Sequence, residues 1–378
     1  MKISSHLLIL TLPFWFVACK EKYDIKVSSS AQSVLVIDGN LNSGIGETSI
    51  RLTRTVPKND TTAVNPESND LVTVEGSDNS IQTLVPIGDG FYNNSQLNML
   101  SGTQYRLRIK TTDGRTYLSD YVVVKNNPPI DSINWKRTSD GVTIYSNTHD
   151  PQNNTWYYRW EYAETYEFHS RYNSIYKYLP ATNEVVPRDP SESIFICWRT
   201  NLSTEILLGS SSKLQSDIIF ENPLQFIPSG SEKLAIRYSI LVKQYSLTKE
   251  AYDYLQIMKK NTESIGSIFG VLPAELSGNI HCLSNPSEQV IGFITISPVH
   301  QTRIFINNSE LPDWNFQMPC VEVLVPNNPD SMKIYFYSFV PVAAYYGSSP
   351  NIVAWYSSDR DCVDCVYRGG TTFKPSFW

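Results

Sequence analysis

The sequence predicts a mainly β protein. An N-terminal immunoglobulin-like or transthyretin-like sandwich should precede a larger β-sandwich-type domain that contains one amphipathic helix. Three observations predict this fold class. Aromatic residues, which favour strands, are frequent, with 23 Tyr, 15 Phe and 8 Trp. Short apolar runs recur between Gly and Pro turn signals. One stretch alone has clear helical spacing.

Residues 1–18 have the pattern of a secretory leader. Lys2 gives the positive start, and the apolar run 7–17 is too short to span a bilayer. Ala18 directly precedes Cys19, which resembles a lipobox, in which the cysteine is acylated and becomes the N-terminus. We expect Cys19 to carry lipid; the alternative is an ordinary signal peptide with an incidental cysteine. Residues 19–32 are polar and should form a tether.

Residues 33–126 are expected to form the N-terminal sandwich, because seven short strands are predicted there with turn signals between them. The predicted strands are 34–39, 49–54, 72–74, 81–85, 91–92, 105–110 and 117–124. Alternation along 105–110 predicts one buried and one solvated face: Tyr105, Leu107 and Ile109 against Arg106, Arg108 and Lys110. The pair Pro128-Pro129 ends this region, since proline cannot donate to a ladder.

Residues 130–378 are expected to form the larger domain. Its predicted strands are 131–135, 142–146, 155–162, 194–198, 218–220, 234–245, 290–296, 303–306, 334–339 and 352–356. A helix is predicted near 248–260, with Thr248 as its N-cap. Four apolar residues would form the stripe that packs on the sheet: Ala251, Tyr254, Leu255 and Met258.

Five cysteines remain after Cys19: Cys197, Cys282, Cys320, Cys362 and Cys365. Export permits disulfides, and an odd number leaves one thiol unpaired or the pairing incomplete. Cys362 and Cys365 form a C-x-x-C pair without the helix that follows a thioredoxin-like dithiol. We therefore expect structural bridges from this pair to Cys282 or Cys320. The spacing does not fix which cysteines pair.

No motif of a catalytic nucleophile, phosphate-binding loop or dinucleotide site occurs. The histidines lack ligand-type spacing, and the net charge of −6 without a basic block is unlike a nucleic-acid-binding protein. We therefore predict a non-enzymatic protein without metal or cofactor. Acidic groups at 150–154 and at Asp359, Asp361 and Asp364 leave calcium as an alternative, although neither matches a calcium loop.

Several tyrosines lie in a polar, irregular stretch within the larger domain. Because aromatic residues on loops often bind glycans, peptides or proteins, we predict an exposed binding surface there. Its candidate residues are Tyr166, Tyr172, Tyr176 and Tyr178.

Long strings in the chain resemble a Bacteroidota lipoprotein family, domain of unknown function 4249 (DUF4249). The strings that carry the resemblance are Val36–Gly39, Asp131–Ile133, Lys260–Glu263, Gly266–Phe269, Gly278–Cys282, Asn285-Pro286, Val290–Phe293, Cys362–Cys365, Arg368–Thr372 and Lys374–Trp378. The resemblance implies an outer-membrane lipoprotein of undetermined activity, commonly encoded beside a TonB-dependent receptor. It brings no catalytic residues. The charged opening Lys20–Asp24 is similar to signals that send such lipoproteins to the cell exterior.

The expected function is that of a surface-exposed outer-membrane lipoprotein, an accessory or ligand-binding partner of a TonB-dependent β-barrel receptor. The alternative is a lipid-anchored enzyme with an unrecognised site in the C-terminal domain. That alternative requires His169 or His281 to meet a carboxylate and a hydroxyl in one pocket. A transmembrane barrel, prompted by the terminal Trp378, fits poorly with a lipidated start and a mid-chain helix.

Overall fold

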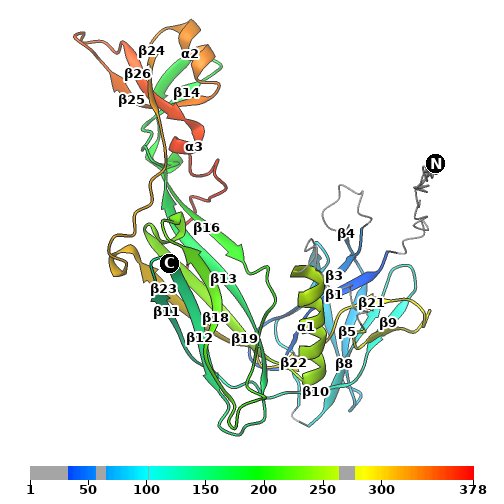
Figure 1. The fold of residues 1–378 in the computed structure, drawn as a ribbon. Helices are drawn as coiled ribbons and strands as arrows, with labels where there is room; N and C mark the ends of the chain where they lie inside the picture. Colours follow the sequence, from blue (N-terminus) through cyan, green and yellow to red (C-terminus); the bar gives the residue numbers. More distant parts are fainter. Residues whose placement is uncertain (1–32, 57–64, 101, 264–276) are drawn as a thin grey trace, which may run out of the picture.

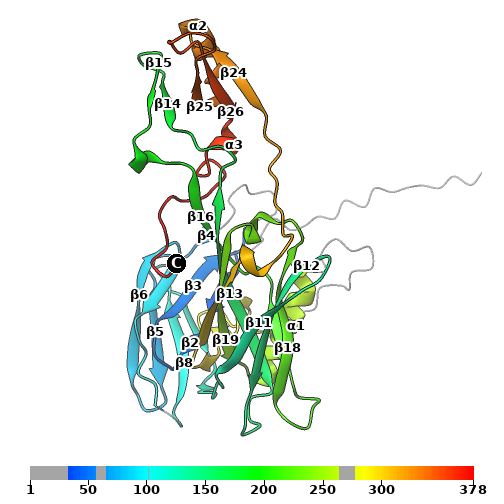
Figure 2. The same ribbon diagram turned by 90° about the vertical axis from the view of Figure 1, so that its left-hand side faces the viewer.

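The computed structural model describes residues 33–56, 65–100, 102–263 and 277–378. Figure 1 shows two β bodies side by side and a small distal lobe that projects from one end of the second body. Figure 2 shows the same lobe standing clear of both bodies. The mainly β, sandwich-type fold is therefore confirmed. Cys19, the leader and the tether lie outside the described residues.

The N-terminal sandwich is an eleven-stranded sheet that folds over at β6 and encloses its own core. β6 pairs first with β5 and then with β7, so it joins the two layers. The predicted alternation is confirmed, since Tyr105, Leu107 and Ile109 are buried. Its strands before residue 126 are β1 (Leu35–Gly39), β2 (Leu41–Asn42), β3 (Thr48–Arg54), β4 (Asn65–Pro66), β5 (Leu71–Gly76), β6 (Ile81–Gly88), β7 (Phe91–Asn94), β8 (Gln104–Lys110), β9 (Thr116–Ser119) and β10 (Val122–Val123), of which β2 lies outside the large sheet.

Three later strands complete this sandwich: β20 (Ile280–Cys282), β21 (Val290–Ile291) and β22 (Ile296–Ser297). They pair with β9, β1 and β2 respectively. Ile280, Ile294 and Ile296 join the N-terminal core. The chain thus returns to its first body, and the predicted boundary at residue 130 does not hold for this segment. A pairing between strands so far apart in sequence leaves no local periodic signal.

The central sandwich packs a three-stranded sheet, β11–β12–β18, against a five-stranded one. In the larger sheet β13 pairs with β16, β17 and β19, and β19 also pairs with β23. Trp160 and Phe168 on β13 are buried in the shared core. The strands are β11 (Ile130–Arg137), β12 (Gly141–His149), β13 (Tyr157–His169), β16 (Ile196–Leu202), β17 (Leu207–Ser210), β18 (Ile218–Pro228), β19 (Arg237–Ser246) and β23 (His300–Asn307), with 3₁₀ turns η2 (Glu232–Leu234) and η3 (Asn308–Glu310).

Helix α1 (Lys249–Glu263) confirms the predicted helix. The Thr248 hydroxyl accepts a hydrogen bond from the Ala251 amide at 3.2 Å, as expected of an N-cap. Ala251 and Tyr254 are buried, while the rest of the predicted stripe is half-buried. The Tyr254 ring lies 5.4 Å from that of Phe293, in the returning segment. Figure 1 shows α1 standing between the two sandwiches.

The distal lobe was not foreseen as a separate body. It has its own small core around Met332, Phe336 and Trp355. Its elements are β14 (Tyr176–Leu179), β15 (Glu184–Pro187), η1 (Pro190–Glu192), β24 (Glu322–Pro326), α2 (Pro329–Tyr335), β25 (Phe339–Tyr345), β26 (Ala354–Asp359) and α3 (Arg360–Val363). The strand predicted at 334–339 is wrong. Asn328 caps α2 by accepting from the Ser331 amide, and Pro329 supplies the fixed first turn of a helix.

The linker between the sandwiches is held by the side chain of Gln244, which is fully buried. Its amide nitrogen donates to the Pro128 carbonyl at 2.9 Å and to the Thr148 hydroxyl at 3.1 Å. Its carbonyl oxygen accepts from the Trp160 indole at 2.9 Å. Asn127 in turn donates to the backbone carbonyl of Gln244 at 2.8 Å. The amide nitrogen and the carbonyl oxygen of the Gln244 side chain are therefore both hydrogen-bonded.

Gln244→Ala should lower the free energy of unfolding by about 2–4 kcal/mol, because it leaves the buried Trp160 indole and the Pro128 carbonyl without partners. Urea denaturation measures the loss. Gln301→Ala, at an exposed position of the neighbouring strand β23, is the matched control and should change stability by less than about 0.5 kcal/mol. Equal stability of the two variants would show that the linker is held by other contacts.

Candidate functional site

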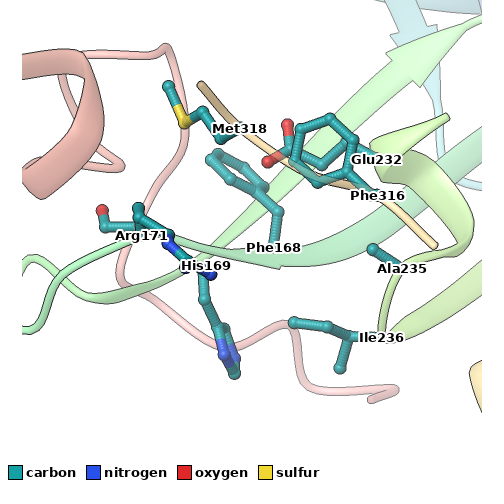
Figure 3. Close-up of a pocket in the computed structure, with 9 residues that line it drawn as sticks. Phe168, His169, Arg171, Glu232, Ala235, Ile236, Phe316 and Met318 are labelled. Atoms are coloured by element: carbon teal, nitrogen blue, oxygen red, sulfur yellow. The ribbon is translucent and has the colours of Figure 1, made fainter. Parts of the chain in front are cut away.

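A small pocket lies where the central sandwich meets the distal lobe. Its volume is about 160 Å³. Figure 3 shows the Phe168 ring in the middle, with Met318 on one side and Phe316 and Glu232 on the other. The pocket is built by the end of β13, by η2 and the residues after it, and by the segment that leads into the lobe. We call it the neck pocket; its lining residues are Phe168, His169, Ser170, Arg171, Glu232, Ala235, Ile236, Phe316 and Met318.

The C-terminal segment supports the neck pocket from below. Arg368 pairs with Glu232 at 2.6 Å and donates to the His169 carbonyl at 2.8 Å. Its guanidinium also lies 4.6 Å from the centre of the Phe168 ring. Gly370 approaches so closely that a Cβ there would lie 2.6 Å from the Phe168 ring. The Glu232 carboxylate is therefore neutralised before any ligand arrives, and the pocket is lined by both polar and apolar groups.

Two polar side chains of the neck pocket, those of Ser170 and His169, have partners within the protein. The Ser170 hydroxyl donates to the Ile194 carbonyl at 3.3 Å, and the His169 imidazole pairs with Glu167 at 2.9 Å. Neither is placed as half of a nucleophile and base pair. Pockets for drug-sized ligands and cofactors span roughly 300–1,000 Å³. The neck pocket is smaller and suits one side chain or a small molecule.

The histidines of the enzyme alternative do find carboxylates. His169 meets Glu167, and His281 lies 3.3 Å from Asp120 at an exposed site. Among the residues the structure describes, neither imidazole is hydrogen-bonded to a hydroxyl. Within the described part of the chain, each histidine therefore has the carboxylate that the enzyme alternative requires, but not the hydroxyl.

The predicted tyrosine surface is wrong for Tyr166, which is buried in the central core. The sequence stretch is not irregular there, because β13 continues through it. Tyr172, Tyr176 and Tyr178 are half-buried and pack on the cores of the distal lobe. Tyr176 lies 4.9 Å from Trp355, and Tyr178 lies 5.0 Å from Phe336, between ring centres. These side chains hold the lobe together.

The cysteines pair as Cys197–Cys365 and Cys320–Cys362. Structural use of the C-x-x-C pair and the bridge to Cys320 are thus found in the structure. The prediction for Cys282 is wrong: it is a free, buried thiol in the N-terminal sandwich. Cys197, which was not among the predicted partners, takes that place. The reason is spatial, since the return of β20 carries Cys282 into a different body.

Two of the acidic residues weighed for calcium, Asp150 and Asp364, hold local backbone in place. Asp150 is buried and accepts from the amides of Gln152 and Asn154 and from the Thr155 hydroxyl. Asp364 accepts from two amides that follow it in the chain. Within the described ranges, no three His, Cys, Asp or Glu residues gather as a metal site, and no helix there is long and apolar enough to cross a bilayer.

Comparison with known families is decisive on one point. The sequence profile of the family described as Domain of unknown function (DUF4249) matches residues 20–303. The chain belongs to the DUF4249 family. No curated protein matches the chain. The family match includes both sandwiches up to β23, whereas most of the distal lobe and the C-terminal segment of this DUF4249 chain lie outside it.

The distal lobe of the DUF4249 chain ends in an apolar surface that the sequence analysis missed. Met332 and Phe336 point into the lobe, so the residues between and after them face outward. Ile334 is 71% exposed, Tyr335 is 45% exposed and Tyr337 is 92% exposed. We call these three residues the tip patch. The signal was present in the helix-starting sequence Asn328-Pro329-Asp330, which places Met332 and Phe336 on one face.

Asp70 is a second unusual site in the DUF4249 chain. It is buried in the N-terminal sandwich, and one carboxylate oxygen accepts from the Thr112 amide at 3.0 Å. The other oxygen has no hydrogen-bond partner among the described residues. Burial is the main cause that raises the pKa of Asp70 to about 6; nearby Glu67 raises it further and Arg54 opposes. The folded state therefore binds the Asp70 proton more tightly than the unfolded state does.

This raised pKa predicts a pH dependence of stability. Because the folded state holds the Asp70 proton more tightly than the unfolded state, the contribution of Asp70 to stability falls as the pH rises from about 4 to about 6. Relative to the parent, Asp70→Asn should gain up to about 3 kcal/mol across that range. Urea denaturation at several pH values measures the difference. Asp140→Asn, at an exposed position, should show no such trend.

The disulfide pairing predicts the result of peptide mapping without reduction. Digestion should give one peptide pair joined through Cys197 and Cys365 and another joined through Cys320 and Cys362. Cys282 should be alkylated only after unfolding, because its side chain is buried. A peptide that joins Cys282 to any other cysteine would contradict the structure.

Proposed function

We propose that this protein is a non-enzymatic, surface-exposed outer-membrane lipoprotein that docks on a TonB-dependent β-barrel transporter through the tip patch. The observation that carries the proposal is the tip patch itself. Large apolar side chains that stand exposed together on a soluble body commonly mark a protein contact, and Tyr is among the residues that dominate such contacts.

The supports behind the tip patch favour a binding role. The lobe has a core of its own, and Tyr178 and Phe336 pack together directly beneath α2. The Asn183 side chain donates to the Pro329 carbonyl at 3.0 Å, which fixes the start of α2 to the β14–β15 hairpin. The Cys320–Cys362 bridge closes the base of the lobe. A preorganised contact surface of this kind loses little entropy on binding.

The neck pocket supports the same role in a secondary way. Its lining includes Phe168, Phe316 and Met318, its carboxylate is already paired with Arg368, and its size fits one side chain. A partner that covers the tip patch along the lobe has this pocket in reach as a second anchor point. The lipid on Cys19, expected from the sequence, would keep the protein at the membrane where the transporter lies.

Photo-crosslinking from within the tip patch tests the proposal. A photoreactive phenylalanine analogue in place of Tyr337 should transfer to a TonB-dependent barrel in intact cells, identified by mass spectrometry. The same probe in place of Phe220, which is 75% exposed on the central sandwich, is the matched control and should not. Ile334→Ser with Tyr335→Ser should lower the crosslinking yield at least tenfold, as expected when hot-spot residues are lost.

The same crosslinking experiment also tests the lipid anchor. With Cys19→Ala, the chain should lose its acyl label, leave the membrane fraction at high salt and lose the crosslink from position 337. If position 337 gave no crosslink while a transporter still co-purified with the protein, the tip patch would not be the docking surface. Turnover of a substrate by the purified chain would overturn the non-enzymatic assignment.

A further inference from the structure

A row of exposed aliphatic residues runs along the outer side of the N-terminal sandwich. Ile81, Val85 and Ile87 alternate along β6 and are 66%, 60% and 62% exposed. Leu71 on β5 is 53% exposed, and the β5–β6 register, which pairs Val72 with Leu84, places it beside Val85 when continued by one residue. Residues two apart on a strand share one face, so the four aliphatic side chains lie on one face, with the exposed Thr83 between Ile81 and Val85. We call these four residues the β6 strip.

A row of cations lies next to the β6 strip. The outward residues of β8 are Arg106, Arg108 and Lys110, and β8 pairs with the far side of β5. Glu75 on β5 pairs with both Arg106 and Arg108, at 2.7 and 3.3 Å. Three cations therefore stand against one carboxylate. Adjacent strands are about 4.8 Å apart, so the basic row lies about 10 Å from the strip.

From this placement we infer that the β6 strip and the basic row form a membrane-facing surface that rests on anionic lipid headgroups. Aliphatic side chains beside cations are the composition that binds the interface of a bilayer, where the apolar part enters the headgroup boundary and the cations meet phosphates. A protein partner is the other occupant of an apolar surface, but the basic row favours the lipid.

The course of the chain favours the same occupant. The described residues begin at Ser33, and β1 (Leu35–Gly39) belongs to the sandwich that carries the strip. Only the residues from Cys19 to Gln32 separate the expected lipid from this sandwich, and they span at most about 50 Å when fully extended. The inference rests in this respect on the lipid anchor of the proposed function. It adds that the anchored sandwich has a defined side toward the membrane.

The two surfaces are compatible in one orientation. In Figure 2, β6 and β5 lie along one side of the molecule, and α2 with the tip patch lies at the end of its long axis. A molecule that rests on β6 therefore extends its distal lobe over the membrane plane. The lobe then points toward neighbouring membrane proteins.

Vesicle sedimentation with the full mature chain carrying Cys19→Ala tests the inference without the lipid anchor. The protein should sediment with vesicles of phosphatidylcholine containing one third phosphatidylglycerol at low salt. It should sediment much less with pure phosphatidylcholine, and high salt should release it. Each basic residue near an anionic surface contributes a factor of about five, so Arg108→Ala with Lys110→Ala should weaken binding about 25-fold.

Variants of the strip separate this inference from the proposed function. Val85→Ser with Ile87→Ser should lose vesicle binding, and near-native circular dichroism and urea denaturation would show that the variant is folded. Tip-patch variants Ile334→Ser and Tyr337→Ser are the matched controls and should bind vesicles like the parent. The inference would be overturned if the strip variant and the parent bound anionic vesicles equally well, or if the parent showed no preference for anionic vesicles. So would a strip variant that binds vesicles normally and loses only the transporter crosslink, because the strip would then be a protein interface.

Discussion

The carboxamide of Gln244 is the contact on which the arrangement of the two sandwiches depends. The linker contains Pro128 and Pro129, which have no amide hydrogen, so it can be held there only through its carbonyl groups. Gln244 donates to the Pro128 carbonyl, and the Thr148 hydroxyl donates to that of Pro129 at 2.9 Å. Asn127 bridges back to the carbonyls of Gln244 and Pro298. These hydrogen bonds fix the linker. With the linker fixed, β20–β22 can pair with the strands of the first sandwich in a single register.

The neck is fixed by different chemistry. Cys362 and Cys365 do not form a redox dithiol, because each sulfur is bonded to a different cysteine elsewhere in the chain. Cys362 bonds to Cys320 at the base of the lobe, and Cys365 bonds to Cys197 on β16. The segment therefore binds the lobe to the central sandwich at two points. Gly370 then lets the C-terminal segment lie against Phe168, which forms the floor of the neck pocket.

The hydrogen-bonded linker and the disulfide-bonded neck connect the parts of the protein that carry the exposed surfaces. The tip patch, the neck pocket and the β6 strip lie on three separate parts of the protein, and each is backed by buried side chains. In the proposals made above, membrane attachment, orientation and contact with a partner are divided among separate surfaces. None of the three proposed roles requires a reacting group, and His169 and Ser170 are hydrogen-bonded within the protein.

The sequence by itself determined the local features. The alternation in Tyr105–Lys110, the cap and stripe of α1, and most strands follow from periodicities of two and 3.6, which act over a few residues. Family membership was recognisable from strings such as Gly278–Cys282. The tertiary structure alone decided which cysteines pair, that Tyr166 is buried and that residues 280–297 complete the first sandwich. Each of these depends on contacts between residues far apart in the chain, and such contacts leave no periodic pattern in either partner.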